Sequence, residues 1–239
     1  MRFKEKCAII TGAARGIGRA AALLFAQEGA QLVACDMNEE GLKALEEALG
    51  QSAATHLFRA CDVSDEEAAR ALVRDAISQF GKVDILINNA GIYRDQLKPF
   101  VEQSSALWRR KMEVNVLGMM YLTQEVLPGM MNRRYGKIVN VASVAGVYGL
   151  RNMVDYSATK GAQISFSMAL AREMGPYGIH VNAVSPGNIN TYAESPGLSY
   201  FGRSGTAEEC ANVIAFLASD DASYVSGQNY IVDGCRKTL

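Results

Sequence analysis

The sequence predicts an α/β protein with one Rossmann-type, doubly wound parallel sheet of about seven strands and helices on both faces. Short apolar runs alternate along the chain with longer segments whose apolar residues recur every three or four positions. Strands that are apolar on both sides, joined by helices, are typical of a parallel sheet covered on both faces. Because 239 residues can build one such core and no linker or repeat interrupts them, we expect a single domain over 1–239.

The strands are expected wherever a short apolar run follows a helical segment, beginning with CAIIT and QLVACD. In order they are 7–11, 31–36, 55–62, 83–89, 136–143, 179–185 and 229–233. The helices are expected between them, at 17–29, 39–50, 65–81, roughly 103–131, 155–175 and 206–219. Gly29, Gly50, Gly81 and Gly175 follow four of these helices, where glycine most easily adopts the left-handed conformation that ends a helix.

Composition and charge argue against several classes of protein. The chain is 49% hydrophobic and 21% charged, which is ordinary for a globular protein. Its 24 Lys and Arg residues against 25 Asp and Glu residues provide no basic surplus for a nucleic-acid partner. No apolar run approaches the roughly 18 residues of a membrane span, and the charged MRFKEK start does not resemble a secretory signal. We therefore expect no membrane association and a cytoplasmic location.

The cysteines and histidines suggest no metal site. The two histidines, His56 and His180, stand apart, and the five cysteines form no C-x-x-C pair. Most of the cysteines lie in apolar, strand-like contexts, so we expect reduced, buried thiols. The cysteines are Cys7, Cys35, Cys61, Cys210 and Cys235.

The first strand ends in T-G-A-A-R-G-I-G, which predicts a nucleotide-binding turn. Glycines there allow a tight turn and a close approach to a pyrophosphate, and the following helix N-terminus offers N–H donors to the phosphates. The spacing is G-x-x-x-G-x-G rather than G-x-G-x-x-G, and a simple turn is the alternative. The residues expected to bind the cofactor here are Gly12, Arg15, Gly16, Ile17 and Gly18.

Acidic and amide residues follow the next strands. Asp36 ends the second strand, where a carboxylate accepts hydrogen bonds from ribose hydroxyls and repels a 2′-phosphate. It therefore favours NAD(H), although NADP(H) stays possible because Arg15 could pair with a phosphate; a plain turn-forming aspartate is a further alternative. Two more groups are expected against the adenine and the ribose: Asp62 and Val63 after the third strand, and Asn89, Ala90 and Gly91 after the fourth.

The segment Y-S-A-T-K places Tyr156 and Lys160 four residues apart, on one face of the expected helix. On its own such a pair is usually two surface residues. Together with T-G-x-x-x-G-x-G, N-N-A-G, Ser143 and S-P-G in this order, however, the chain resembles the short-chain dehydrogenase/reductase family over nearly its whole length. That resemblance implies an oxidoreductase that transfers hydride between a nicotinamide and a secondary alcohol or ketone.

The resemblance also implies the catalytic set: Asn115, Ser143, Tyr156 and Lys160. Tyr156 would exchange the proton, and Lys160 with the cofactor would lower its pKa from the ordinary value of roughly 10. Ser143 would donate a hydrogen bond to the substrate oxygen. Lys160 would also hold the nicotinamide ribose. Asn115 would kink the long helix and hold a water through which Lys160 relays the proton.

The S-P-G-N-I-N-T segment after the sixth strand resembles the part of the family that holds the carboxamide. The residues that match are Pro186, Gly187, Ile189 and Thr191. The substrate segment that follows, at about 188–205, is shorter than in most of the family and predicts a more open pocket. Candidates to line that pocket are Tyr93, Tyr148, Met153, Tyr192 and Tyr200.

Within the family the motifs come nearest to the 3-oxoacyl-[acyl-carrier-protein] reductase branch, in which Arg134 and Arg172 would face an acidic carrier. Surface arginines there are also common in other dehydrogenases, and Asp36 fits poorly with an NADPH enzyme. An NAD-linked sugar, polyol or steroid alcohol dehydrogenase is therefore the alternative. A catalytically silent nucleotide-binding scaffold or sensor is a third, different class. The resemblance also implies a homotetramer.

Overall fold

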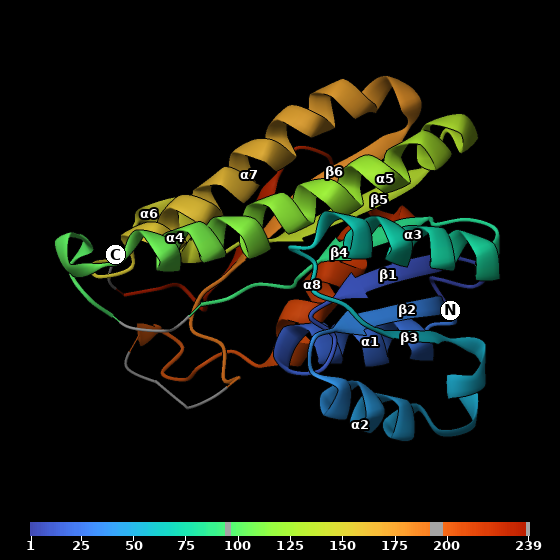
Figure 1. Ribbon diagram of the computed structural model, residues 1–239, viewed down its shortest axis with the longest axis horizontal. Helices are drawn as coiled ribbons and strands as arrows, with labels where there is room; N and C mark the ends of the chain where they lie inside the picture. Colours follow the sequence, from blue (N-terminus) through green and yellow to red (C-terminus); the bar gives the residue numbers. More distant parts are fainter. Residues whose placement is uncertain (94–96, 192–197, 238–239) are drawn as a thin grey trace.

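A seven-stranded parallel sheet forms the middle layer of the computed structural model, which describes residues 1–93, 97–191 and 198–237 (Figure 1). The strand order is β3-β2-β1-β4-β5-β6-β7, and every neighbouring pair is parallel. The chain builds the sheet outward from β1 to one edge, returns to the centre, and then builds to the other edge. This is the doubly wound Rossmann-type topology that the sequence predicts.

The elements follow the predicted alternation. The strands are β1 (Cys7–Thr11), β2 (Gln31–Asp36), β3 (Leu57–Ala60), β4 (Ile85–Asn88), β5 (Gly136–Val141), β6 (Ile179–Pro186) and β7 (Asn229–Val232). The α-helices are α1 (Gly16–Gln27), α2 (Glu39–Leu49), α3 (Glu66–Phe80), α4 (Ser105–Met112), α5 (Gly118–Arg133), α6 (Val144–Tyr148), α7 (Val154–Met174) and α8 (Ala207–Ala218). Short helical turns are η1 (Gly50–Thr55), η2 (Phe100–Glu102), η3 (Glu113–Leu117), η4 (Gly175–Tyr177) and η6 (Asp220–Ala222).

Two hydrophobic cores lie on opposite faces of the sheet. Ala8 and Ile10 of β1 point into a core with α1, α2 and α8, whereas Cys7 and Ile9 point into one with α3, α5 and α7. Figure 1 shows the same two helical layers on either side of the strands. Because both faces are covered, β1 is buried at every position, which explains why unbroken apolar runs identify the strands.

The structure differs from the sequence prediction mainly in the long helical stretch. The segment expected over roughly 103–131 consists of α4, the π-helical turn η3 and α5, which ends at Arg133. The π turn contains Asn115, where the resemblance implied a kink. Gly175 is also not left-handed as predicted, because the chain continues from it into η4. Cys235 is exposed, in contrast to the other four thiols, which are buried as expected.

Candidate active site

The predicted site residues gather at the carboxyl ends of the strands. Gly12 follows β1, Asp36 ends β2, Asn89 follows β4, Ser143 follows β5 and Gly187 follows β6. Parallel strands bring their carboxyl ends to one edge of the sheet, so residues far apart in sequence become neighbours there.

The glycine turn after β1 is packed so closely that no side chain fits at Gly12 or Gly18. A Cβ added to Gly12 would lie 2.8 Å from Asn89 Nδ2, and one on Gly18 would lie 2.0 Å from the Gly12 carbonyl oxygen. Asn89 Nδ2 donates to the carbonyls of Thr11 and Gly12 at 2.9 and 3.1 Å, and the Ala90 N–H donates to Thr11 Oγ1. Asn89 therefore fixes the turn against the end of β4.

This turn fits a dinucleotide phosphate. Arg15 precedes α1 in an extended conformation and does not cap the helix with its side chain, so the first N–H groups of α1 are left for a ligand. A Cβ on Gly16 would lie 3.2 Å from Thr191 Cγ2. The segment after β6 therefore passes over the glycine turn, as a site enclosing a cofactor requires. Ile17, in the first turn of α1, packs against the core on that face of the sheet.

The segment after β6 is held in place by its neighbours. A Cβ on Gly187 would lie 2.5 Å from Asp233 Cβ, so only glycine fits after Pro186. Ile189 forms a bridge with Gly205, next to a hydrogen bond of 2.8 Å from the Asn190 N–H to the Gly205 carbonyl.

Asp36 is oriented by the backbone at the end of β2. Its Oδ2 accepts from the Ala14 N–H at 3.0 Å, and its Oδ1 accepts from the Asn38 N–H at 2.9 Å. Each carboxylate oxygen has a second lone pair, so the group can still accept from ribose hydroxyls. This geometry fits the adenosine ribose of a nicotinamide dinucleotide.

Asp62 takes part in an ion pair that the sequence did not indicate. Its Oδ2 accepts from Arg110 of α4 at 2.7 Å, and its Oδ1 accepts from Ser64 Oγ at 2.7 Å. Burial acts to raise the pKa of Asp62, but the hydrogen bonds from Ser64 and Arg110 outweigh it and hold the pKa below its usual value. Through its ion pair with Arg110, Asp62 therefore links the end of β3 to α4. The expected contact between Asp62 and adenine stays a prediction. Val63 packs beside Gly118, where an added Cβ would lie 2.8 Å away.

The three predicted catalytic side chains Ser143, Tyr156 and Lys160 lie together. Ser143 precedes α6, and its Oγ accepts from the Ala145 N–H at 3.1 Å; its side chain is near enough to the Tyr156 hydroxyl to act on the pKa of that group. Tyr156 and Lys160 share one face of α7, with Lys160 Nζ 5.6 Å from the centre of the tyrosine ring. Both residues are buried, at 8% and 4% exposure, so their chemistry is largely shielded from bulk water.

Burial shifts the two titratable groups in opposite directions. It raises the pKa of the Tyr156 hydroxyl; the hydrogen bond with Ser143 lowers it in part, and the nearby Tyr93 raises it further. Burial lowers the pKa of Lys160 to about 7. The protein without cofactor therefore does not lower the pKa of Tyr156, and the lowering expected from Lys160 together with a cofactor stays a prediction. Such a lowering would need the positive ring of an oxidised nicotinamide cofactor.

Asn115 joins the segment after β4 to α7. Its Oδ1 accepts from the Ile92 N–H at 2.8 Å, and its Nδ2 donates to Thr159 Oγ1 at 3.0 Å. A Cβ on Gly91 would lie 3.2 Å from Asn115 Oδ1 and 3.6 Å from Lys160 Nζ. Gly91 thus leaves room beside the lysine, where the sequence predicts the ribose.

Two residues of α7 next to this set were not predicted. Gln163 Oε1 accepts from Lys160 Nζ at 2.8 Å, and Thr159 Oγ1 donates to the Tyr156 carbonyl at 2.8 Å. The sequence held a signal for Gln163, because a residue three positions after Lys160 lies on the same helical face. Lys160 Nζ also donates to the Val141 carbonyl at 2.8 Å.

Of the residues predicted to line a pocket, Tyr93 and Met153 lie beside Tyr156. The Tyr93 ring meets the Tyr156 ring edge-on at 5.0 Å, and Met153 belongs to a small apolar cluster with Tyr156. Tyr148 and Tyr200 are exposed, Tyr200 with Lys237 over its ring. Tyr192 lies outside the described residues.

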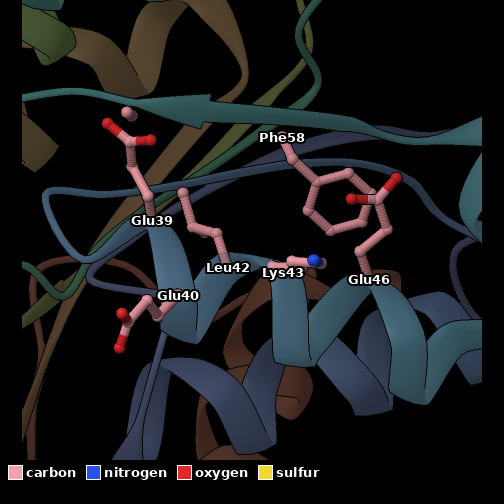
Figure 2. A pocket seen from close by; sticks show the side chains of 7 residues that line it. Glu39, Glu40, Leu42, Lys43, Glu46 and Phe58 are labelled. Carbon is pink, nitrogen blue, oxygen red and sulfur yellow. The ribbon is translucent and has the colours of Figure 1, made fainter.

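A separate groove of about 490 Å³ lies between α2 and β3, away from these residues (Figure 2). It is lined by Glu39, Glu40, Leu42, Lys43, Glu46, Phe58 and Ala60. None of them is a predicted site residue. Within the described ranges, no group of three or more His, Cys, Asp or Glu residues could hold a metal ion. In the same ranges, no helix is long and apolar enough to cross a bilayer.

The chain is similar to known proteins over nearly its whole length. A family model described as Enoyl-(Acyl carrier protein) reductase matches residues 12–235. The 3-oxoacyl-[acyl-carrier-protein] reductase of Thermotoga maritima is 41% identical, over 98% of each chain. The cyclohexanol dehydrogenase of an Acinetobacter species is 40% identical, over 98% of this chain and 95% of its own. The structure of NAD⁺-bound xylitol dehydrogenase has a TM-score of 0.91 at 33% identity, over 98% of this chain and 100% of its own.

Proposed function

Because the chain belongs to the short-chain dehydrogenase/reductase family, we propose that it interconverts a 3-oxoacyl thioester and a 3-hydroxyacyl thioester on an acyl carrier, with NAD(H) as cofactor. Membership of the family makes it an oxidoreductase that acts on CH–OH or keto groups with a nicotinamide cofactor. The observation that carries the proposal is the arrangement at the carboxyl end of β5, where the half-buried Ser143 lies beside the buried Tyr156 and Lys160. One domain over 1–239 would carry both the cofactor site and the catalytic residues.

The residues of the chain would act on the substrate oxygen. Tyr156 would donate its phenolic proton to that oxygen during reduction and take it back during oxidation. Ser143, whose side chain lies near the Tyr156 hydroxyl, would stabilise the charge that develops on the same oxygen. Lys160 would hold the nicotinamide ribose and bias the ionisation of Tyr156. A bound nicotinamide dinucleotide would supply or accept the hydride.

Cofactor preference in this proposal depends on Asp36. Two backbone N–H groups hold its carboxylate at the end of β2, so it cannot easily turn away from the adenosine ribose. A fixed negative charge there favours the ribose hydroxyls of NAD(H) over the 2′-phosphate of NADP(H). The relative solved with NAD⁺ is consistent with this preference.

The acyl-carrier substrate is supported by the identity to the Thermotoga maritima reductase and by the short segment at about 188–205. Arg134 and Arg172 would face the acidic carrier; in the structure each donates a hydrogen bond to a backbone carbonyl and lies at the surface. A cytoplasmic location and a homotetramer belong to the same proposal.

The second candidate is an NAD-linked dehydrogenase of a sugar, polyol or steroid alcohol. Asp36 favours it, because it disfavours NADPH, and the Tyr93 ring beside Tyr156 could pack against a ring-shaped substrate. The names of two relatives, cyclohexanol dehydrogenase and xylitol dehydrogenase, support the same alternative.

The test is a substrate panel combined with a Tyr156→Phe variant. Initial rates would be measured with 3-oxoacyl thioesters, cyclic alcohols, polyols and steroids, each with both cofactors. We expect Tyr156→Phe to lower turnover by about 100- to 10,000-fold while NADH affinity, measured by fluorescence, stays the same. Tyr224→Phe, at a fully exposed tyrosine, is the matched control. Turnover of Tyr156→Phe within threefold of the wild type would disprove the proposed role and favour a silent scaffold.

A further inference from the structure

Gln163 fills the space between the predicted catalytic lysine and the π-helical turn of the long helix. Its Oε1 accepts from Lys160 Nζ at 2.8 Å, and its Nε2 donates to the main-chain carbonyl of Asn115 at 2.7 Å. The three residues are buried, with Gln163 at 1%, Lys160 at 4% and Asn115 at 0% exposure. The Gln163 side-chain amide thus connects the π-helical turn η3, which lies between α4 and α5, to Lys160 of α7.

The Asn115 carbonyl that accepts from Gln163 lies in the π-helical turn. A π turn interrupts the regular hydrogen-bond register of an α-helix and is often found at a functional site. A buried carbonyl without a donor is costly. Gln163 supplies the donor, and it can do so from α7 because Gln163 lies on the same face of that helix as Lys160.

We propose that Gln163 is the positioning residue of the catalytic lysine: its amide bridges Lys160 Nζ and the Asn115 carbonyl directly, in the place where the sequence led us to expect a water. This inference rests on the proposed function, because it assigns Gln163 a role in the same proton transfer. The amide fixes Lys160 Nζ from a second side, since the Val141 carbonyl already accepts from it at 2.8 Å. An ammonium has three N–H donors, and two are used in this way. The third stays available for the cofactor ribose or the Tyr156 side of the site.

An amide differs from a water at this position in two ways. It is held by its own helix, so it places the lysine nitrogen more precisely than a mobile water would. It also donates only from nitrogen and accepts only at oxygen, so it does not pass protons along as a water does. The bridge therefore positions Lys160, and it blocks proton transfer between the lysine and the Asn115 carbonyl.

The bridge also influences the charge on Lys160. Burial disfavours its ammonium form, whereas the hydrogen-bond acceptors Gln163 Oε1 and the Val141 carbonyl favour that form. Among the described residues, the titratable groups nearby are Tyr156 on the same helix, Tyr93 after β4, and the Lys111–Asp155 ion pair at the start of α7. Loss of the Gln163 acceptor should therefore reduce the positive charge beside Tyr156.

Two variants separate this role from simple packing: Gln163→Met keeps the volume without either hydrogen bond, and Gln163→Ala leaves room for a water. We expect Gln163→Met to lower kcat about tenfold and to move the acid limb of the oxidation pH profile up by about one unit, with little change in KM for substrate. Gln163→Ala should recover part of both losses, because a water can then contact Lys160 and the Asn115 carbonyl. If Gln163 only fills space, the order of the two kcat values reverses. Gln163→Ala would then have the lower kcat, because it leaves a cavity that Gln163→Met fills.

A second measurement does not depend on turnover. In cofactor-free protein labelled with ¹³C at lysine Cε, NMR titration gives the pKa of Lys160, assigned by the signal missing from Lys160→Met. We expect a lower pKa in Gln163→Met than in the wild type, and an intermediate value in Gln163→Ala. An unchanged pKa in Gln163→Met, or a kcat order that follows packing, would overturn the inference. If the wild type turns over no alcohol or ketone, the proposed function fails, whereas the NMR result still decides the role of Gln163.

Discussion

A buried ion pair between α4 and α7 gives the sharpest prediction for stability. Lys111 Nζ lies 2.5 Å from Asp155 Oδ2, and the two side chains are only 3% and 1% exposed. The other oxygen of Asp155 accepts from the Tyr156 N–H at 2.8 Å, so the pair holds the first turn of α7, which contains the proposed catalytic tyrosine. Lys111→Met should therefore leave a carboxylate buried without a cation.

The free-energy cost of Lys111→Met follows from the burial of this ion pair. Removing one partner of a fully buried ion pair typically destabilises a protein by about 3–5 kcal/mol. Total stabilities are about 5–15 kcal/mol, so the variant should lose a large share of its free energy of unfolding. Replacing both charges should restore most of the loss, because the uncompensated charge is what costs. Lys111→Met with Asp155→Asn keeps an oxygen that can accept from the Tyr156 N–H.

Urea unfolding measures this difference. Trp108 of α4, the single tryptophan of the chain, reports on the affected helix by fluorescence, and circular dichroism follows the whole molecule. We expect a large loss for Lys111→Met and a recovery of at least half in the double variant. A loss under about 1 kcal/mol for Lys111→Met, or a double variant as unstable as the single one, would refute the reasoning.

Two other predictions concern charge. Asp36→Asn removes the negative charge expected beside the ribose, so the ratio of kcat/KM with NADPH to kcat/KM with NADH should rise by about tenfold or more. The control variant Asp62→Asn should leave that ratio unchanged. An unchanged ratio in Asp36→Asn would exclude Asp36 as the group that selects the cofactor. The pKa of Lys160 is lowered by burial to about 7 from an unfolded value near 10.5, so the unfolded chain binds more protons between these values and stability should rise with pH above 7. The free energy of unfolding of the wild type, measured against Lys160→Met between pH 7 and 8.5, should therefore increase by about 1 kcal/mol per pH unit, and a flat difference would contradict the lowered pKa.

Local sequence determined most of the fold. Apolar runs and helical periodicity located the seven strands, because the five inner strands are buried or nearly so by helices on both faces of the sheet, and the more exposed edge strands β3 and β7 still contain short apolar runs. The sequence-based prediction of helices was wrong where the geometry of a helix depends on contacts with other elements rather than on local helix propensity. The stretch over roughly 103–131 was predicted as one helix, yet a π turn at Asn115 divides it, and its carbonyl is satisfied by Gln163 from α7. No local pattern contains that contact.

The candidate site divides in the same way. The sequence by itself determined the glycine turn, the acid that ends β2, and the four-residue step from Tyr156 to Lys160, because each depends on spacing within one element or one strand-to-helix connection. Only the tertiary structure decided which side chains meet across elements: Asp62 with Arg110, Lys111 with Asp155, and Lys160 through Gln163 with Asn115. The physical reason is that periodicity fixes which face of a helix is buried, whereas the partner it meets there depends on how α4 and α7 pack against each other.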